Sequence, residues 1–518
     1  MSKNIFYLFC ISLIVISSCK STRIGQAAND DQKIEITFVQ VNDVYEIAPL
    51  EGGKVGGMAK VATIKKESVA QNPNTFMVIA GDFLSPSVYN SLKHEGKRIR
   101  GRQMIESMNV AGMDIAVFGN HEFDIEENEL QDRLNESTFQ WVSSNSFHQT
   151  SNGIKPFERI TSTGRELFPE TYFLDVKDAD GTTARIGFIG INLPFNKAKY
   201  VSYTDPLSTA ERLFHRIKDS CDAVVALTHQ AVEDDSLLAV KLPELAIIIG
   251  GHEHDMRHLK VGNVHITKAH ANAKSAFIIN MGINKKSGEI SISPQLRMID
   301  ETVTLDSATN VVVQKWMDIG EKNYASLGFD AAKVVREKGE PLDGRETEIR
   351  SKPTNLTRIV VSAIEKAAPL AQMAIFNSGS VRVDDIIQMP VTQYDIIRSL
   401  PYGGSILEVE MKGSLLLRIL DVGRTNAGSG GFLQFSAFVK FDEVQKTWTL
   451  NESPILPGSI YRVAISDFLL TGGEANMGFL TRDNSDIIKI HPQVTDISDP
   501  RSDIRLAIIR YLELLGGK

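Results

Sequence analysis

The chain has 518 residues, 42% of them hydrophobic and 23% charged. This length and composition predict a globular protein of about two to four domains, each able to bury a core. The formal net charge of −8 argues against a general nucleic-acid-binding or anionic-membrane-binding surface, so no nucleic-acid partner is expected.

The N-terminus has the pattern of an export signal. Lys3 precedes an apolar run, Ile5 to Ile16, that is too short to span a bilayer as a helix. The run ends in Ile-Ser-Ser-Cys19, which resembles a bacterial lipobox. The resemblance implies a signal peptide over 1–18 and a lipid on Cys19. Residues 19–32 would then tether the protein to the periplasmic or cell-surface side of a bacterial membrane. The alternative is an ordinary signal peptide with an incidental cysteine.

Cysteine usage predicts no intrachain disulfide. Cys10 would leave with the signal peptide and Cys19 would carry the lipid, so Cys221 would be alone. Its place before the apolar run Asp222 to Leu227 predicts an ordinary buried thiol rather than a catalytic one.

Five predicted strands of the first half each deliver polar side chains at their end. The apolar segments begin near Ile34, Thr75, Asp114, Cys221 and Leu245, and helical patterns such as Ala59–Ala70 and Gln103–Ala111 lie between them. The side chains delivered are those of Asn42, Asp43, Asp82, Asn120, His121, His229, His252 and His254. Because ligands gather at the carboxyl ends of strands in α/β sheets, we expect these residues to converge.

The converging groups are carboxylates, an amide and imidazoles, without a thiolate. Such a set suits a divalent Zn, Mn, Fe, Co or Mg ion. Asp82 is the natural bridging carboxylate, and two neighbouring ions would clamp the oxygens of an in-line phosphoryl displacement. Asp124 is placed to orient His121, whose unperturbed pKa lies near neutrality. Taken singly, each motif could be only a polar turn.

The order of these blocks resembles the signature of the calcineurin-like metallophosphoesterases. The forms GNHEFD at 119–124 and GGHEHD at 250–255 narrow the resemblance to the 5′-nucleotidase and UDP-sugar hydrolase branch. It implies an α/β fold in which residues 33–305 form a four-layer α-β-β-α sandwich. Residues 306–344 would be a linker helix and turn, and residues 345–518 a C-terminal α/β nucleotide-binding domain.

The resemblance also assigns roles. One divalent ion would be held by Asp43, Asp82 and His254, and a second by Asp82, Asn120, His229 and His252. His121, backed by Asp124, would stabilise the transition state or protonate the leaving oxygen. One departure is Tyr45, which stands where the family usually has a histidine ligand. On an extended segment Tyr45 and Asp43 would point to the same side, so the phenol would occupy the space of that ligand. A neutral phenol is a poor ligand, so we expect the first ion to be held weakly by Asp43, Asp82, His254 and water; the alternative is a ferric ion bound to Tyr45 as phenolate.

The second half carries blocks that resemble the family's substrate domain. They lie around 376–382, 399–404, 430–434 and 467–474. The resemblance implies that two phenylalanines stack on the nucleobase, that arginines hold the phosphate, and that an acid contacts the ribose. Stacking and forked guanidinium groups suit those roles physically. The substrate-binding residues would be Arg350, Asn377, Arg382, Phe432, Phe468 and Glu474; the alternative for the two phenylalanines is a place in the core.

These observations predict a two-metal phosphohydrolase in which a metal-bound hydroxide releases phosphate from nucleoside 5′-monophosphates. UDP-sugar or 2′,3′-cyclic nucleotide hydrolysis is an alternative within the same chemistry. A different alternative is a degenerate, non-catalytic nucleoside-binding lipoprotein, because of Tyr45. The native metals and the oligomeric state stay open.

Overall fold

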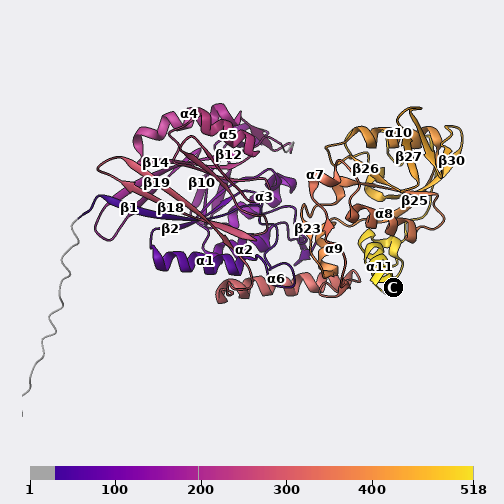
Figure 1. Ribbon diagram of the computed structural model, residues 1–518, viewed down its shortest axis with the longest axis horizontal. Coiled ribbons are helices and arrows are strands. Elements are labelled where there is room, and N and C mark those ends of the chain that lie inside the picture. Colours follow the sequence, from indigo (N-terminus) through magenta and orange to yellow (C-terminus); the bar gives the residue numbers. More distant parts are fainter. Residues whose placement is uncertain (1–29, 196–197, 517–518) are drawn as a thin grey trace, which may run out of the picture.

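The computed structural model describes residues 30–195 and 198–516, so the expected signal peptide, Cys19 and most of the tether lie outside the described residues. The described chain forms two lobes, with the long helix α6 (Ser307–Ser326) running along the base of the first towards the second (Figure 1). Within the described ranges, no helix is both long enough and apolar enough to cross a membrane.

The first lobe contains two six-stranded sheets. In the first sheet, β1, β2, β5 and β6 run parallel, and β18 is antiparallel to both of its neighbours, β1 and β19. Its order is β19 (Glu289–Met298), β18 (Ser275–Asn284), β1 (Lys33–Val41), β2 (Thr75–Ala80), β5 (Ile115–Val117) and β6 (Gln140–Trp141).

The second sheet has a parallel centre with an antiparallel strand at each edge. Its order is β11 (Thr171–Lys177), β12 (Thr183–Asn192), β14 (Ala223–His229), β15 (Ile247–Gly251), β17 (Val264–Lys268) and β16 (Arg257–Val261). Short hairpins decorate the lobe: β3 (Lys93–His94) with β4 (Lys97–Arg98), β9 (Glu158–Thr161) with β10 (Gly164–Leu167), and β7 (Ser146–Thr150) between β8 (Gly153–Lys155) and β13 (Val201–Tyr203).

The two sheets pack face to face. Apolar side chains of both meet in one buried cluster, in which the Phe38 and Phe188 rings lie edge to face with centroids 5.8 Å apart. The outer faces are covered by helices: α1 (Met58–Gln71), α2 (Arg102–Ala111) and α6 on the first sheet, and α4 (Pro206–Ile217) and α5 (Val232–Lys241) on the second (Figure 1). The shorter α3 (Glu127–Glu136) follows β5. The expected four-layer α-β-β-α sandwich is therefore confirmed.

The second lobe is the expected α/β domain. Its five-stranded sheet has the order β26 (Leu433–Phe435), β22 (Met373–Asn377), β30 (Ile460–Ser466), β25 (Ile406–Lys412) and β31 (Ile487–Ile490). One face packs on α8 (Asn355–Ala367) and α11 (Ile504–Gly516), and the other on α10 (Gly413–Thr425). Smaller elements are β20 (Val334–Arg336), β21 (Leu342–Asp343), α7 (Glu346–Ile349), β23 (Ile386–Ile387), β24 (Val391–Thr392), α9 (Gln393–Ser399), β27 (Val439–Asp442), β28 (Thr447–Leu450) and β29 (Ser453–Pro454).

Cys221 differs slightly from the expectation of a buried strand residue. It is half-buried and precedes β14, with its thiol donating to the Ile217 carbonyl at 3.3 Å. It is the one free cysteine among the described residues, and burial raises its pKa, as befits an unreactive thiol.

Candidate active site

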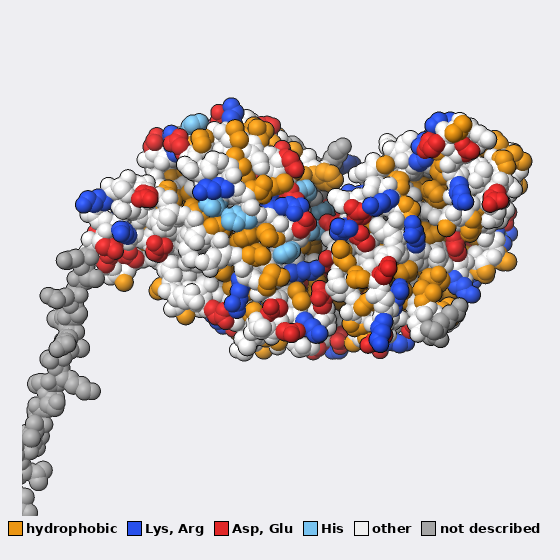
Figure 2. Space-filling view, viewed as in Figure 1, with side chains coloured by type: hydrophobic (Ala, Val, Ile, Leu, Met, Phe, Trp, Pro, Cys, Tyr) orange, Lys and Arg blue, Asp and Glu red, His pale blue; other side chains and the backbone are white. Residues whose placement is uncertain are grey.

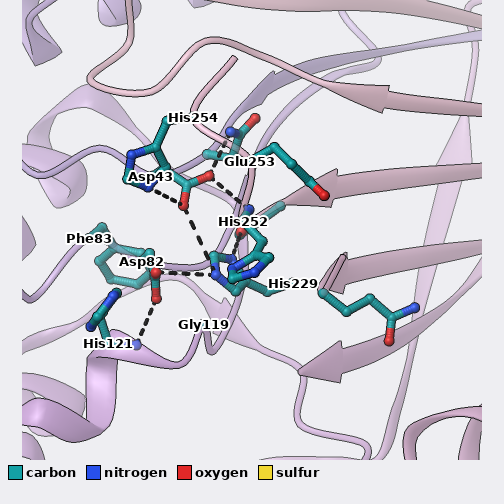
Figure 3. Close-up of polar contacts among 12 residues, drawn as sticks. Asp43, Asp82, Phe83, Gly119, His121, His229, His252, Glu253 and His254 are labelled. Carbon is teal, nitrogen blue, oxygen red and sulfur yellow. Dashed lines mark hydrogen bonds and ion pairs between the residues drawn. The ribbon is translucent and has the colours of Figure 1, made fainter. Parts of the chain in front are cut away.

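The carboxyl ends of β1, β2, β5, β14 and β15 meet at one place in the first lobe, and most of the predicted ligands lie there (Figure 3). Three of them have left-handed backbone conformations, with φ of 53° at Asp43, 56° at Asp82 and 93° at His252. Such conformations are costly for residues other than glycine and cluster at functional sites. At Gly119 a side chain would overlap the Asp82 carboxylate, so glycine is required.

Asp43, Asp82 and His229 form the buried centre of the site. One donor atom from each lies within 4.8 Å of the others. The His229 Nδ1 atom bonds the Ala80 carbonyl at 2.7 Å, which fixes the tautomer and directs Nε2 towards Asp82 Oδ2, 3.1 Å away. Nε2 is buried and makes no hydrogen bond. A pair of carboxylates with an unused imidazole nitrogen fits a divalent cation of the Zn, Mn or Co type.

The electrostatics of this centre favour a cation. Burial acts against the charged form of Asp82, yet the neighbouring His229 and His121 hold the pKa of that carboxyl below its usual range. Burial and the adjacent His229 lower the pKa of His252 to about 4, so its imidazole is neutral, the form that binds metals. The His252 ring lies beside His229, with centroids 5.4 Å apart. Asn120 is buried in the loop that follows β5.

His254 and Tyr45 lie on the Asp43 side of the centre. The His254 Nε2 atom is 3.6 Å from Asp43 Oδ1. The Tyr45 hydroxyl is 3.1 Å from that Nε2 and 3.2 Å from Asp82 Oδ2. The Tyr45 side chain thus lies beside Asp43, as expected. The segment that places it there is not extended as predicted, because the backbone of Asp43 has a left-handed conformation. Burial and the two aspartates raise the pKa of Tyr45 well above 10, so the phenol stays protonated.

His121 and Asp124 form the expected pair. His121 Nδ1 lies 2.6 Å from Asp124 Oδ2, and the His121 backbone N–H donates to Asp82 Oδ1 at 2.8 Å. Although burial lowers the pKa of His121, Asp82 and Asp124 together raise it above 6.5. A protonated imidazole can therefore be presented beside the Asp43–Asp82–His229 centre near neutral pH.

Two buried networks that hold the site were not anticipated. The Glu122 carboxylate accepts four backbone N–H groups, at 2.6 to 3.0 Å, and so ties the loop after β2 to the loop after β5; the donors are Asp82, Phe83, Leu84 and Gly119. Under the turn that carries His252 and His254, the fully buried Lys268 ammonium contacts Asp235 at 2.9 Å and also binds Glu253.

The predicted substrate residues of the second lobe fall into two groups. One consists of the two arginines, and the other of Asn377, Phe432, Phe468 and Glu474. Arg382 approaches the first lobe, with Nη2 3.7 Å from Asp124 Oδ2, whereas Arg350 pairs with Glu346 of its own lobe. Asn377 donates to Glu474 at 2.7 Å. Phe468 is 42% exposed.

Phe432 is half-buried. The surroundings of two nearby glycines show that the loops carrying Phe432 and Phe468 lie close to Glu474. A side chain built at Gly431 would lie 3.1 Å from Glu474, and one at Gly473 would lie 3.7 Å from the Phe468 ring. The two aromatic loops thus adjoin Glu474. Phe468 is open to solvent rather than in the core, as a stacking platform requires. Figure 2 shows that the surface between the two lobes is hollowed.

Comparison with known proteins agrees with this geometry. Residues 36–256 match the calcineurin-like phosphoesterase family model, and residues 332–481 match the 5′-nucleotidase C-terminal domain. The 5′-nucleotidase of Bos taurus is 23% identical over 504 residues, covering 85% of this chain and 83% of its own length.

Two solved structures share the fold. A 5′-nucleotidase precursor from Thermus thermophilus has a TM-score of 0.67 at 21% identity and covers 93% of this chain and 97% of its own. The sulfate thiohydrolase SoxB of Thermus thermophilus has a TM-score of 0.61 at 14% identity, covering 93% and 94%. Proteins that act on different substrates thus share this architecture, so the fold does not determine the substrate and the side chains of the site do.

Proposed function

Because the chain belongs to the 5′-nucleotidase family, with a calcineurin-like phosphoesterase domain followed by a 5′-nucleotidase C-terminal domain, we propose that it releases phosphate from nucleoside 5′-monophosphates with two divalent metal ions. It is a metal-dependent phosphoester hydrolase. The observation that carries the finer proposal is the buried Asp43–Asp82–His229 centre, with the His121–Asp124 pair beside it.

Metal binding, proton donation and phosphate binding are assigned to different residues of the chain. Asp43, Asp82 and His254 would hold one ion, and Asp82, Asn120, His229 and His252 the other. When bound, the two ions would polarise the phosphate and lower the pKa of the attacking water. His121, held by Asp124, donates a proton to the leaving oxygen or stabilises the charge that develops on it. Arg382 lies at the junction of the lobes, where its guanidinium group suits phosphate oxygens.

A substrate panel tests the proposal. Full-length protein loaded with Mn²⁺ is incubated separately with 5′-AMP, UDP-glucose, 2′,3′-cyclic AMP and p-nitrophenyl phosphate, and loss of each substrate and formation of its products (phosphate, nucleoside, UMP, 3′-AMP or p-nitrophenol) are measured. We expect the highest kcat/KM with 5′-AMP, because the aromatic loops and Glu474 offer contacts to a nucleoside. Preference for UDP-glucose or the cyclic nucleotide would reject the monophosphate as the main substrate.

Removing the Phe468 ring tests the nucleoside grip. Phe468→Ala is expected to reduce binding of 5′-AMP by about 1–3 kcal/mol, the usual value of one base–aromatic stack. The same substitution should leave kcat/KM for p-nitrophenyl phosphate unchanged, and Phe432→Ala should behave alike. Equal losses with both substrates would point to a packing defect and remove the case for base stacking.

Substitutions of Tyr45 test how tightly the first ion site holds its metal. A protonated phenol is a poor ligand, so we expect wild-type protein to retain fewer than two ions per chain after dialysis, measured by elemental analysis. Tyr45→His should raise this number towards two. Tyr45→Phe is the matched control, since it removes the hydroxyl without supplying a ligand, and should not raise the metal content. Two ions retained by wild-type protein after dialysis against chelator would contradict this expectation.

A further inference from the structure

The histidines of the site differ in which group contacts their Nδ1 atom. His229 Nδ1 bonds the Ala80 carbonyl and His121 Nδ1 faces Asp124, so both are oriented from within the first lobe. His254 is different. Its Nδ1 lies 2.8 Å from Asp384 Oδ2, in the second lobe, while its Nε2 faces Asp43. One imidazole of the metal centre is therefore held by a carboxylate that comes from the other domain.

Asp384 is itself held by its own lobe. Its other carboxylate oxygen accepts the backbone N–H of Glu346, at the start of α7. Its backbone has a φ of 37°, which is unusual for a residue other than glycine and is maintained only where the surroundings impose it. The carboxylate is thus presented to His254 in a fixed direction, two residues beyond Arg382.

We propose that Asp384 is a positioning residue that orients His254 for the first metal ion and does so only while the two lobes are together. This rests on the proposed function, which assigns His254 as a ligand. A carboxylate on the outer nitrogen fixes the tautomer and ring angle of a metal-binding histidine. Because this carboxylate belongs to the second lobe, separating the lobes leaves the His254 ring without that partner.

Two consequences follow from this arrangement. Tyr45 supplies no imidazole to the first ion, so the site depends heavily on His254. By linkage, an ion that binds more tightly when the lobes are together also favours that arrangement of the lobes to the same extent. Metal loading of the first domain and docking of the substrate-binding domain thus favour one another.

Calorimetric titration of Mn²⁺ into the metal-free full-length protein tests the proposal. In Asp384→Asn a single amide oxygen faces two donors, the His254 ring and the Glu346 N–H, so one contact is lost; asparagine also tolerates the positive φ. We expect one bound Mn²⁺ to weaken about 10- to 100-fold, the usual effect of losing such a partner. The second Mn²⁺ should bind as in wild type, which also shows that the variant is folded.

Asp385→Asn is the matched control. It makes the same charge change at the next residue. It also removes the ion pair between Asp385 and Lys274 across the same junction, and it leaves the contact of Asp384 with His254 in place. We expect its Mn²⁺ affinities to equal those of wild type. Equal weakening in both variants would assign the effect to lobe packing, and an unchanged Asp384→Asn titration would remove the role of Asp384; either result overturns the proposal. Failure of wild-type protein to bind Mn²⁺ would instead overturn the proposed two-metal function and this inference with it.

Discussion

Replacing His121 with alanine is expected to lower kcat for 5′-AMP by about 10²–10⁴-fold, the usual contribution of a positioned proton donor. The metal content should be nearly unchanged, because the ring is held by Asp124 and only the backbone N–H contacts the Asp82 carboxylate. That N–H is still present in the alanine variant. Steady-state kinetics and elemental analysis of the same preparation check both parts.

His491 provides the control for this substitution. Its Nε2 faces the Glu410 carboxylate at 2.8 Å, so it is also a histidine–carboxylate pair, but on the sheet of the second lobe. His491→Ala should retain wild-type kcat. Loss of metal from His121→Ala would show that His121 is a ligand rather than a proton donor.

Replacing Lys268 with methionine is expected to destabilise the first lobe by about 3–5 kcal/mol, the cost of leaving buried carboxylates without their cation. Lys268 and Asp235 are both fully buried, and Glu253 lies between His252 and His254, two of the proposed ligands. Lys285 pairs with Asp222 at a partly exposed position, and Lys285→Met should cost only about 1 kcal/mol or less. Denaturant unfolding followed by circular dichroism compares the two variants; similar small losses would mean that the buried network contributes little.

The strands and their ends were predictable because local pattern determines them. The continuous apolar runs at 75–80 and 245–249 have the length and composition of buried strands, and the polar residues that follow such strands lie at the edge of the sheet. The sandwich itself came from the resemblance of the motif series, since sheet order and layer packing depend on contacts between distant segments. Strand β1 pairs with β18, which lies about two hundred and forty positions later in the chain. No local sequence pattern predicts a pairing between such distant segments.

The parts of the site that escaped prediction are those set by tertiary contacts. Asp384 has no sequence feature that connects it to His254, because the contact exists only where the two lobes meet. Glu122 was visible as an acid in the motif, but its four backbone partners come from two loops. The geometry assumed for Tyr45 was wrong because a left-handed Asp43 is a local strain that the surrounding fold imposes.

Phosphate release from 5′-AMP, measured while metal is returned to chelator-stripped full-length protein, tests most directly whether the strand-end ligands drive the hydrolysis. The stripped protein should be inactive, and added Mn²⁺ or Co²⁺ should restore phosphate release in parallel with metal binding. Asp82→Asn, which removes the proposed shared ligand, should prevent this recovery. Full activity in the stripped protein, or no activity with both ions bound, would contradict a two-metal phosphohydrolase.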